Sequence, residues 1–332
     1  MPKVSIIVPC YNEENTIGYL LDAICDQTYS LREIEVIISD GMSIDNTLDV
    51  INKFKDNHPN LNIIIVKNEK KNIPSGLNRA IESSNGDIII RLDAHSIPAK
   101  DYVQLCINDL EKGLGNNIGG VWDIKPQSEK IVAKSIALSA SHPIAVGDAK
   151  YRYTNKPAYV DTVPFGAFYK NYIIDIGAFD ETLLTNEDYE LNVRIRQNGG
   201  QVWLNPNIRS IYFARSNYID LAKQYWRYGF WKLEMLKRYP ETIRWRQALP
   251  PIFLTCVVFL FFLSIWYDIA RFLIVAQLLL YISIIVLSTI PVTIKEKDIR
   301  YLVTIPIAII VMHQSWAVGF LTSIFSKLFS RQ

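Results

Sequence analysis

Apolar runs and amphipathic stretches alternate along the first 112 residues of the chain. An apolar run at 4–9 is followed by helical spacing over 14–27, and the same order then repeats three times. The later runs lie at 34–40, 61–67 and 87–92, and the later helical stretches lie at 45–55, 74–83 and 98–112. Strands that alternate with helices build a mainly parallel sheet with helices on both faces. We therefore expect an α/β domain over residues 1–215.

The pattern changes near Leu249, after which charged residues become rare. Three uncharged runs follow at 250–267, 272–292 and 301–325. A helix needs about 20 apolar residues to cross the hydrocarbon core, so the first run is near the lower limit and the other two fit well. Runs without a polar face disfavour a buried hairpin of a soluble protein. We predict a transmembrane region over 249–332 with about three helices, of which one could instead be re-entrant or interfacial.

Between these two parts, residues 216–248 mix aromatic and basic side chains. Amphipathic helices that lie in the headgroup zone have this composition. The basic residues favour a cytoplasmic side for the front domain, and the run at 4–8 is too short for a signal peptide. We expect a multi-pass protein of the cell (inner) membrane with a cytoplasmic catalytic domain. With three spans, Lys327 and Arg331 would fall outside, against the positive-inside rule, so the span count stays open.

Composition and missing motifs argue against several classes of function. The 35 Lys+Arg and 33 Asp+Glu residues give a formal net charge of +2, which argues against a nucleic-acid binder. The four cysteines form no CxxC pair, so a disulfide framework or a zinc site is not expected. The chain has no GxxxxGK[ST] motif, and no GxGxxG follows the first predicted strand. These absences exclude a P-loop NTPase and weaken a dinucleotide-binding interpretation.

Polar residues follow the carboxyl ends of the predicted strands, where open α/β sheets bind their ligands. They lie at 9–13, 40–43, 67–69 and 93–95. Carboxylates at these positions suit a ligand with base N–H or sugar hydroxyl donors, together with a metal that bridges phosphates. Asp93 and His95 could both face one Mg²⁺ or Mn²⁺ if the turn is tight. The alternative is that Asp93 caps a helix starting near Pro98 and that His95 lies on the surface.

Three further motifs also have a local explanation. Asp40 is suited to the turn before Gly41, and Asp45 to the N-cap of the next helix. Glu187 and Asp188 open a helical segment, where the helix dipole stabilises carboxylates. The functional alternative is a general base aimed into the ligand crevice. Residues 224–228 suit membrane anchoring.

Three blocks of the sequence resemble family 2 inverting glycosyltransferases of the GT-A fold. These blocks are residues 4–13, 91–95 and 186–190, and the resemblance extends over about residues 3–228. The Asp-Ala-His triplet at 93–95 and residues 160–168 are similar to the succinoglycan-biosynthesis ExoA-type subgroup. The resemblance implies a GT-A domain (a Rossmann-like, mainly parallel mixed sheet), then interfacial amphipathic helices and a transmembrane tail.

The resemblance also implies an activity. It is the transfer of a sugar from a nucleotide-diphosphate sugar, UDP-linked as in UDP-glucose, to a polyprenyl-linked oligosaccharide in extracellular or capsular polysaccharide synthesis. The implied cofactor is Mn²⁺ or Mg²⁺. Two alternatives stay open: a polyprenyl-phosphate glycosyl synthase, whose acceptor is a lipid phosphate, and a non-catalytic nucleotide-sugar-binding membrane protein.

Site residues follow from the resemblance position by position. Asp188 would be the general base, with Glu187 beside it. Asp93 would hold metal and phosphate, with His95 in the second acidic position. The nucleotide-sugar contacts would be Pro9, Tyr11 and Glu13, with Asp40 reading the base edge and Asn78 nearby. Gln224, Arg227 and Tyr228 resemble the family's QxxRW element.

Two departures from the family pattern bear on these roles. His95 replaces an aspartate, which bears on the strength of metal binding. Leu77 stands where many members have an arginine before the asparagine that aligns with Asn78. Lys71 and Arg79 are therefore candidates for the phosphate contact.

Overall fold

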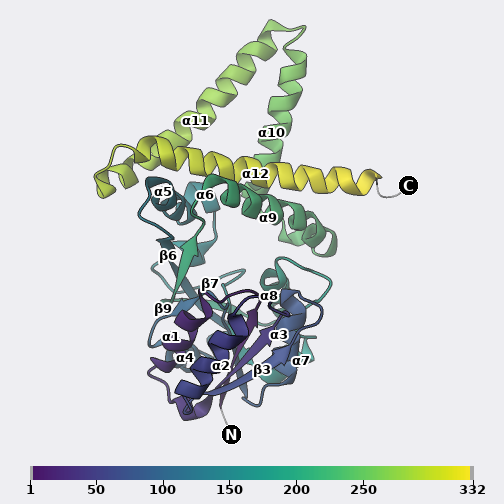
Figure 1. Ribbon diagram of the computed structural model, residues 1–332. Helices are drawn as coiled ribbons and strands as arrows, with labels where there is room; N and C mark the ends of the chain where they lie inside the picture. The colour runs from purple at the N-terminus through teal and green to yellow at the C-terminus, as the bar shows by residue number, and fades with distance from the viewer. Residues whose placement is uncertain (1–2, 330–332) are drawn as a thin grey trace. The chain divides into compact units, whose positions relative to one another are not determined.

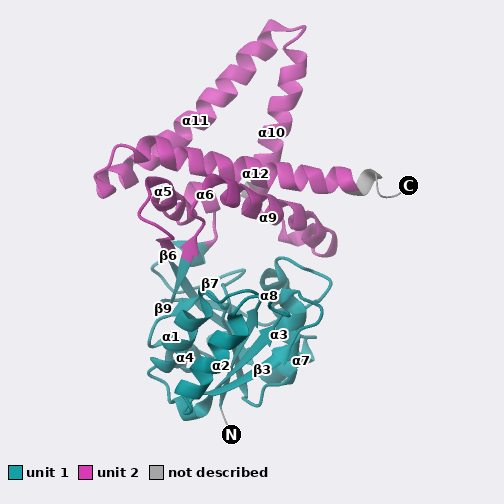
Figure 2. Cartoon of the chain, in the orientation of Figure 1, with its two compact units in different colours: residues 1–123, 150–212 teal, residues 124–149, 213–332 magenta. Residues whose placement is uncertain are grey.

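The computed structural model describes residues 3–329 and divides the chain into two compact units. Unit 1 comprises residues 1–123 and 150–212, and unit 2 comprises residues 124–149 and 213–332 (Figure 2). The boundary between residues 212 and 213 lies near the predicted one at 215. Residues 124–149 join the tail in unit 2, which the hydrophobic pattern does not indicate. The prediction for the side of the membrane on which Lys327 and Arg331 lie cannot be compared with the structure. Arg331 and the side chain of Lys327 lie outside the described part of the chain.

In unit 1, the described residues form one nine-stranded mixed sheet (Figure 1). Its strand order is β3-β2-β1-β4-β8-β6-β9-β5, and β7 pairs with β9. The strands are β1 Val4–Cys10, β2 Ile34–Asp40, β3 Asn62–Lys67, β4 Ile88–Arg91, β5 Ile97–Pro98, β6 Asn117–Pro126, β7 Ala158–Tyr159, β8 Ala167–Tyr169 and β9 Val202–Ala214. The first four are parallel to one another, as predicted, whereas β8 is antiparallel to both β4 and β6. The later strands therefore make the sheet mixed.

Helices cover both faces of this sheet. They are α1 Ile17–Cys25, α2 Thr47–Asn57, α3 Ile73–Glu82, α4 Tyr102–Glu111, α7 Lys170–Asp175 and α8 Glu187–Gln197, with 3₁₀ turns η1 Leu31–Glu33 and η2 Lys150–Arg152. Side chains alternate along β1, so that Ile6 packs in one buried cluster with α1 and α4. Ile7 packs in a second cluster that includes Leu77 of α3 and Leu191 of α8. This two-sided core confirms the predicted α/β architecture.

One predicted helix is shorter than expected. The helical pattern over 98–112 becomes α4 only from Tyr102, because Ile97 and Pro98 form β5 and pair with β9. The interpretation of Asp93 as the cap of a helix starting near Pro98 is therefore wrong. Asp93 instead lies in the connection that leaves β4.

Apart from the last residues of β6 and β9, the secondary structure of unit 2 is helical. Its helices are α5 Ile131–Ala140, α6 Pro143–Val146, α9 Tyr218–Arg238, α10 Trp245–Leu263, α11 Asp268–Glu296 and α12 Tyr301–Phe329, with a 3₁₀ turn η3 Pro240–Thr242. In the described residues, α11 and α12 are long and apolar enough to cross a membrane, whereas the apolar part of α10 covers only 247–263. Figure 1 shows α12 lying along α9, while α10 and α11 form a hairpin that projects from this pair.

Polar contacts tie the short helices of unit 2 to the long ones. The Ser135 hydroxyl lies 2.6 Å from the Thr304 hydroxyl. His142 Nε2 is 3.1 Å from the carbonyl oxygen of Ser288, and His313 Nε2 is 3.0 Å from that of Ile144. The segment 124–149 therefore folds with the apolar tail.

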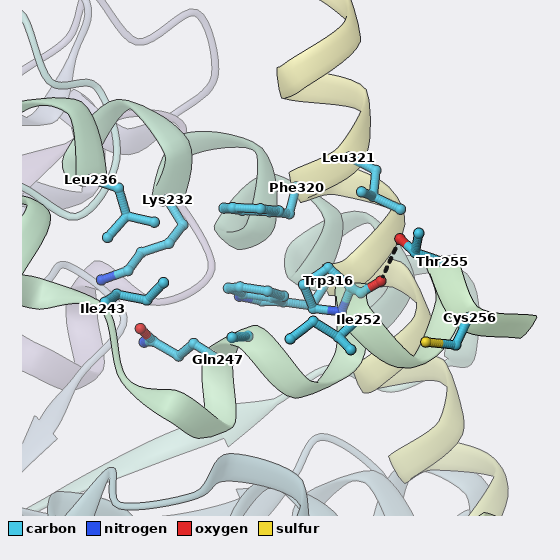
Figure 3. Close-up of a pocket in the computed structure, with 12 residues that line it drawn as sticks. Lys232, Leu236, Ile243, Gln247, Ile252, Thr255, Cys256, Trp316, Phe320 and Leu321 are labelled. Atoms are coloured by element: carbon cyan, nitrogen blue, oxygen red, sulfur yellow. Dashed lines mark hydrogen bonds between the residues drawn. The ribbon is translucent and has the colours of Figure 1, made fainter. Parts of the chain in front are cut away.

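A cavity of about 300 Å³ lies between α9, α10 and α12 (Figure 3). Its wall is almost entirely carbon. Lining residues include Lys232, Ala248, Ile252, Cys256, Trp316 and Phe320. Lys232 contributes its stem, because its ammonium donates to the carbonyl oxygen of Thr242 at 3.2 Å.

Candidate active site

The ends of β1 and β4 meet through Glu13 and His95. Glu13 Oε1 is 3.1 Å from His95 Nδ1, and the other carboxylate oxygen accepts from the Thr16 hydroxyl. The His95 side chain is 49% exposed and that of Glu13 23%. An imidazole beside a carboxylate at the open edge of a parallel sheet can contact a polar ligand. The structure thus brings together two predicted site residues that are 82 positions apart.

The ends of β1 and β2 are also tied together. Asp40 is buried, and its carboxylate accepts from the backbone N–H and hydroxyl of Ser43, the latter at 2.6 Å. Ser43 in turn accepts from the backbone N–H of Asn12, which has a left-handed φ of 54°. Tyr11, next to Asn12, is 50% exposed. Asp40 therefore shapes the turn that presents Tyr11.

A buried arginine connects β4 with α8. Arg91 Nη2 lies 3.1 Å from Asp93 Oδ1 and 2.9 Å from Glu187 Oε1. The Arg91 side chain is only 5% exposed, and its Nη1 has no hydrogen-bond partner among the described residues. The sequence alone indicates no role for Arg91. The feature that could have identified Arg91 is a single cation at the end of an otherwise apolar strand, because a buried cation is costly unless it is paired.

Burial sets the ionisation of the two carboxylates that begin α8. It raises the pKa of Asp188, and the Arg91 cation works against that rise. Burial likewise raises the pKa of Glu187, with Arg91 again opposing it and Asp188 adding to it. Asp188 is half-buried, and Glu187 is 6% exposed. A carboxylate with a raised pKa is a stronger base than an ordinary one, which suits Asp188 for proton abstraction.

The start of α8 is fixed by backbone geometry. Asn186 precedes Glu187 with a left-handed φ of 69°. Along α8, Glu190 forms an ion pair with Arg194 at 2.7 Å, and Arg194 also donates to the carbonyl oxygen of Ile176. These contacts hold α8 against the loop that precedes it, and so hold Glu187 and Asp188 at its first turn.

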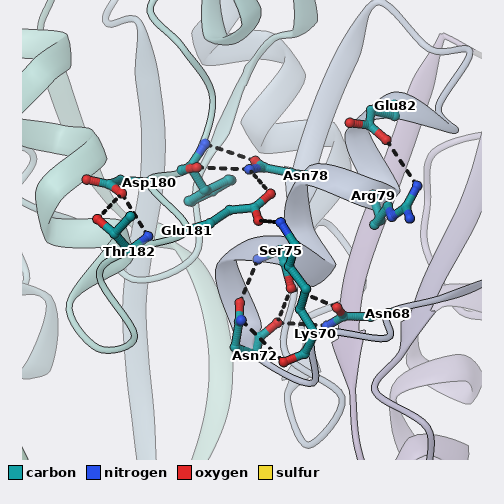
Figure 4. Close-up of polar contacts among 11 residues, drawn as sticks. Asn68, Lys70, Asn72, Ser75, Asn78, Arg79, Glu82, Asp180, Glu181 and Thr182 are labelled. Atoms are coloured by element: carbon teal, nitrogen blue, oxygen red, sulfur yellow. Dashed lines mark hydrogen bonds and ion pairs between the residues drawn. The ribbon is translucent and has the colours of Figure 1, made fainter.

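Asn78, a predicted nucleotide contact, is bonded in the structure to the loop before α8 (Figure 4). Its amide donates to the carbonyl oxygen of Phe179 at 2.9 Å and to Glu181 Oε1 at 3.0 Å. Its own carbonyl oxygen accepts from the Phe179 N–H at 2.9 Å. Lys70 pairs with the other Glu181 oxygen, and bonds from Lys70 and Asn78 lower the pKa of Glu181. Asn78 therefore anchors the loop that leads to α8.

The two basic candidates beside Asn78 lie at the surface. Arg79 pairs with Glu82 at 3.8 Å, and its side chain is 58% exposed. Lys71 is exposed and has a left-handed φ of 54°.

The described residues contain no cluster of three or more His, Cys, Asp or Glu side chains that could hold a metal. Asp93 is 27% exposed, and Arg91 contacts its Oδ1 atom. His95 is paired with Glu13. A divalent ion here would take one or two protein ligands and complete its shell with water and ligand phosphates, as Mg²⁺ commonly does.

The predicted QxxRW-like residues lie in α9, which belongs to unit 2. Gln224 Nε2 donates to the Tyr228 hydroxyl at 2.9 Å, one helical turn along. Tyr225 and Tyr228 pack edge to face with ring centroids 5.6 Å apart. This part of α9 is therefore an ordered polar and aromatic surface.

Comparison with known proteins places this geometry in a family. The family model "Glycosyl transferase family 2" matches residues 5–177. A relative from Methanococcus voltae is 29% identical over 326 residues, 96% of each chain. It is named dolichyl N-acetyl-alpha-D-glucosaminyl phosphate 3-beta-D-2,3-diacetamido-2,3-dideoxy-beta-D-glucuronosyltransferase. Succinoglycan biosynthesis protein ExoA from Rhizobium meliloti is 24% identical, over 74% of this chain and 73% of its own.

Solved structures share the fold. A mannosyltransferase from Pyrobaculum calidifontis, in complex with GDP-Man and Mn²⁺, matches 98% of this chain and 88% of its own with a TM-score of 0.66 at 18% identity. S. aureus TarS 1-349 in complex with UDP-GlcNAc matches 70% of this chain and 66% of its own with a TM-score of 0.51 at 18% identity. The GT-A fold and the resemblance predicted from sequence are thereby confirmed. Since the family model covers more than half of the chain, this protein belongs to glycosyl transferase family 2 and is a glycosyltransferase.

Proposed function

We propose that the chain transfers a sugar, with inversion, from a nucleotide-diphosphate sugar to a hydroxyl of a polyprenyl-phosphate-linked glycan. The observation that carries this proposal is the pair of contacts made by buried Arg91, which holds Glu187 next to Asp93 and so keeps Asp188 near the end of β4. The Methanococcus voltae relative is named for a dolichyl-phosphate-linked acceptor and matches almost the whole chain. That name supports a lipid-linked acceptor here, in glycan or polysaccharide synthesis.

In this mechanism Asp188 is the general base. Its carboxylate takes the proton of the acceptor hydroxyl while that oxygen attacks the anomeric carbon. The bond to the diphosphate breaks on the opposite face of the sugar, which inverts the configuration. Burial favours the step, because the raised pKa of Asp188 makes it a better proton acceptor. Glu187 stays paired with Arg91 and keeps the first turn of α8 in place.

The donor nucleotide would lie over the ends of β1 and β2. Tyr11 is exposed enough to stack on a base, and Pro9, Glu13 and Asp40 complete this edge. We propose a uridine nucleotide, with UDP-glucose as the first donor to try. Lys71 and Arg79 are the proposed phosphate contacts, whereas Asn78 acts by holding the 179–181 loop.

Mn²⁺ or Mg²⁺ fits the residues present if it binds together with the diphosphate. Asp93 would supply an oxygen ligand, and His95 a nitrogen that Mn²⁺ accepts more readily than Mg²⁺. When bound, such an ion neutralises charge that develops on the leaving diphosphate. Glu13 orients the His95 ring through its hydrogen bond to Nδ1.

Unit 2 supplies a place for the lipid part of the acceptor. The carbon-lined cavity between α9, α10 and α12 suits an isoprenoid chain, because an apolar cavity of about 300 Å³ gains little from water. The exposed apolar side chains of α10 and α11 suit a bilayer. We propose a membrane-bound, multi-pass enzyme with its catalytic unit in the cytoplasm, where nucleotide sugars are available.

A donor and acceptor screen tests the function. Purified protein with Mn²⁺ or Mg²⁺ is given a panel of nucleotide sugars and either polyprenyl-phosphate-N-acetylglucosamine or polyprenyl phosphate. Mild acid then cleaves the sugar–phosphate bond. Release of a disaccharide supports the proposal, whereas release of only the donor monosaccharide would mean that the lipid phosphate is the acceptor. Donor binding without turnover on any acceptor would contradict an enzymatic role.

A further inference from the structure

Helices α9 and α12 are in direct backbone contact. A Cβ atom added at Gly229 would lie 2.0 Å from the carbonyl oxygen of Trp316, and one added at Gly319 would lie 2.1 Å from that of Trp226. Eight residues before Trp226, the Tyr218 hydroxyl donates to the carbonyl oxygen of Thr304 at 3.1 Å. The two helices therefore run in parallel, side by side, over most of α9 (Figure 1). Glycine at each close approach is what allows it.

Helix α9 is too charged to enter the hydrocarbon core. Its charged residues are Asp220, Lys223, Arg227, Lys232, Glu234, Lys237 and Arg238. Each such residue costs about 2.5–3.5 kcal/mol at the centre of a membrane helix. Because α12 is held against α9, the two helices must share one depth. About 39% of the most apolar stretch of α12 is buried by protein, against 11% of that of α11.

The α10–α11 hairpin has the opposite character. Its outer surface is apolar, with Phe259 62% exposed and Leu280 63% exposed. The hairpin leaves α12 near Tyr281, whose hydroxyl is 3.0 Å from His313 Nδ1. From there to the start of α11 the helix advances about 20 Å at 1.5 Å per residue.

The reach of the hairpin matches a bilayer. An amphipathic helix sinks about 5–10 Å into the headgroup boundary, so the tip would reach the far side of a core about 30 Å thick. The tip carries Trp266, Tyr267 and an Asp268–Arg271 ion pair. Aromatic and charged side chains of this kind are typical of the membrane–water interface.

We propose that the α9–α12 pair lies in the plane of the bilayer and that only the α10–α11 hairpin crosses it. Helix α12 is then an interfacial helix despite its apolar composition. This inference rests on the proposed membrane location. It places Lys295, Lys297 and Arg300 on the same side as the basic residues of α9, in agreement with the positive-inside rule. By sequence, Lys327 and Arg331 also fall on that side, which removes the conflict that a three-span arrangement creates.

Sidedness provides the first test, in the full chain reconstituted in vesicles of known orientation. Cys256→Ser removes the exposed native thiol, and its residual labelling is the blank. Single cysteines are then placed at exposed positions: Tyr19→Cys marks the catalytic unit, Trp266→Cys the hairpin tip and Phe325→Cys the far part of α12. A membrane-impermeant thiol reagent should label residues 19 and 325 from one side and residue 266 from the other. Labelling of 325 together with 266 would overturn the proposal, as would a tip that is labelled from neither side.

Depth provides the second test. A fluorophore at Ile307→Cys or Val318→Cys in α12 is compared with one at Leu280→Cys in α11, using lipids brominated at defined depths. We expect the two α12 positions to be equally shallow and position 280 to be deep. A crossing α12 would place Ile307 and Val318 about 16 Å apart along the helix axis and at different depths. If position 280 is also shallow, the proposed membrane location of the protein is contradicted. A deep position in α12 would instead contradict only the interfacial placement of α12.

Discussion

Arg91 Nη2 lies between Asp93 Oδ1 at 3.1 Å and Glu187 Oε1 at 2.9 Å, so one buried cation joins the end of β4 to the first turn of α8. The phosphate side and the base side of the proposed reaction thus share one counter-ion. Removing one partner of a buried pair typically costs about 3–5 kcal/mol, because a charge is left uncompensated. The Arg91 contacts therefore affect both the position of the first turn of α8 and the ionisation of Asp188.

The first prediction concerns pH. Asp188 must be ionised to act as a base, and burial raises its pKa, so activity should fall as pH drops through a pKa above that of an ordinary aspartate. Arg91 lowers this pKa. Arg91→Met should therefore move the acid limb of kcat/KM to higher pH, whereas Arg91→Lys keeps the charge and should move it less. Circular dichroism checks that both variants fold. A folded Arg91→Met enzyme with an unshifted limb would contradict the electrostatic role.

The second prediction separates the two carboxylates of α8. Asp188→Asn should lower kcat by about 10²–10⁴, which is the usual contribution of a general base. Donor affinity, measured by calorimetry, should change little, because the variant keeps the shape of the side chain. Glu187→Gln is the matched control and should mainly lower stability, since it weakens the bond to Arg91. Wild-type turnover by Asp188→Asn would remove Asp188 from the mechanism.

The third prediction addresses the Asn78 anchor. Asn78→Ala leaves the N–H and carbonyl oxygen of Phe179 without these partners and should cost about 1–3 kcal/mol of stability. The loosened 179–181 loop should lower kcat more than it raises the KM for the donor. Arg79→Ala, in the same helix, changes an exposed side chain and should raise the donor KM if it contacts phosphate. A rise in donor KM alone for Asn78→Ala would instead favour a direct nucleotide contact.

The parallel half of the fold followed from sequence because each strand and helix there is a contiguous pattern. The antiparallel strands did not, since β5 and β7 have two residues each and exist only through pairing with β9. At the site, the polar and acidic residues that follow the strand ends could be identified from the sequence. The contact of Arg91 with Glu187 joins residues 96 positions apart and depends on the tertiary fold. The proposed depth of α12 in the membrane depends on its contact with α9. The apolar sequence of α12 does not contain that contact, and taken alone it indicated a membrane-spanning helix.

The fourth prediction uses two helical glycines as a pair. Gly229→Ala would press a methyl group against the Trp316 carbonyl and separate α9 from α12. Overpacking of this kind typically costs about 1–3 kcal/mol. Gly18→Ala in α1 meets nothing within 4 Å and should be neutral, or stabilising by up to about 1 kcal/mol. Thermal unfolding in lipid nanodiscs should show a lower Tm for the first variant only. Equal Tm values would mean that the α9–α12 contact is looser than the structure has it.

The last prediction concerns the carbon-lined cavity of unit 2. Ala248→Trp should fill part of it, because Ala248 lines the wall. If the cavity holds the isoprenoid chain, the KM for a long-chain acceptor should rise roughly ten-fold, equivalent to about 1.4 kcal/mol. The KM for an acceptor with only one or two isoprene units should change little, since such a chain buries less apolar surface. Val258→Trp, on the same helix but exposed and outside the cavity, is the control and should leave both values unchanged. An equal loss on long and short acceptors would indicate a damaged fold, and no loss on either would place the lipid chain elsewhere.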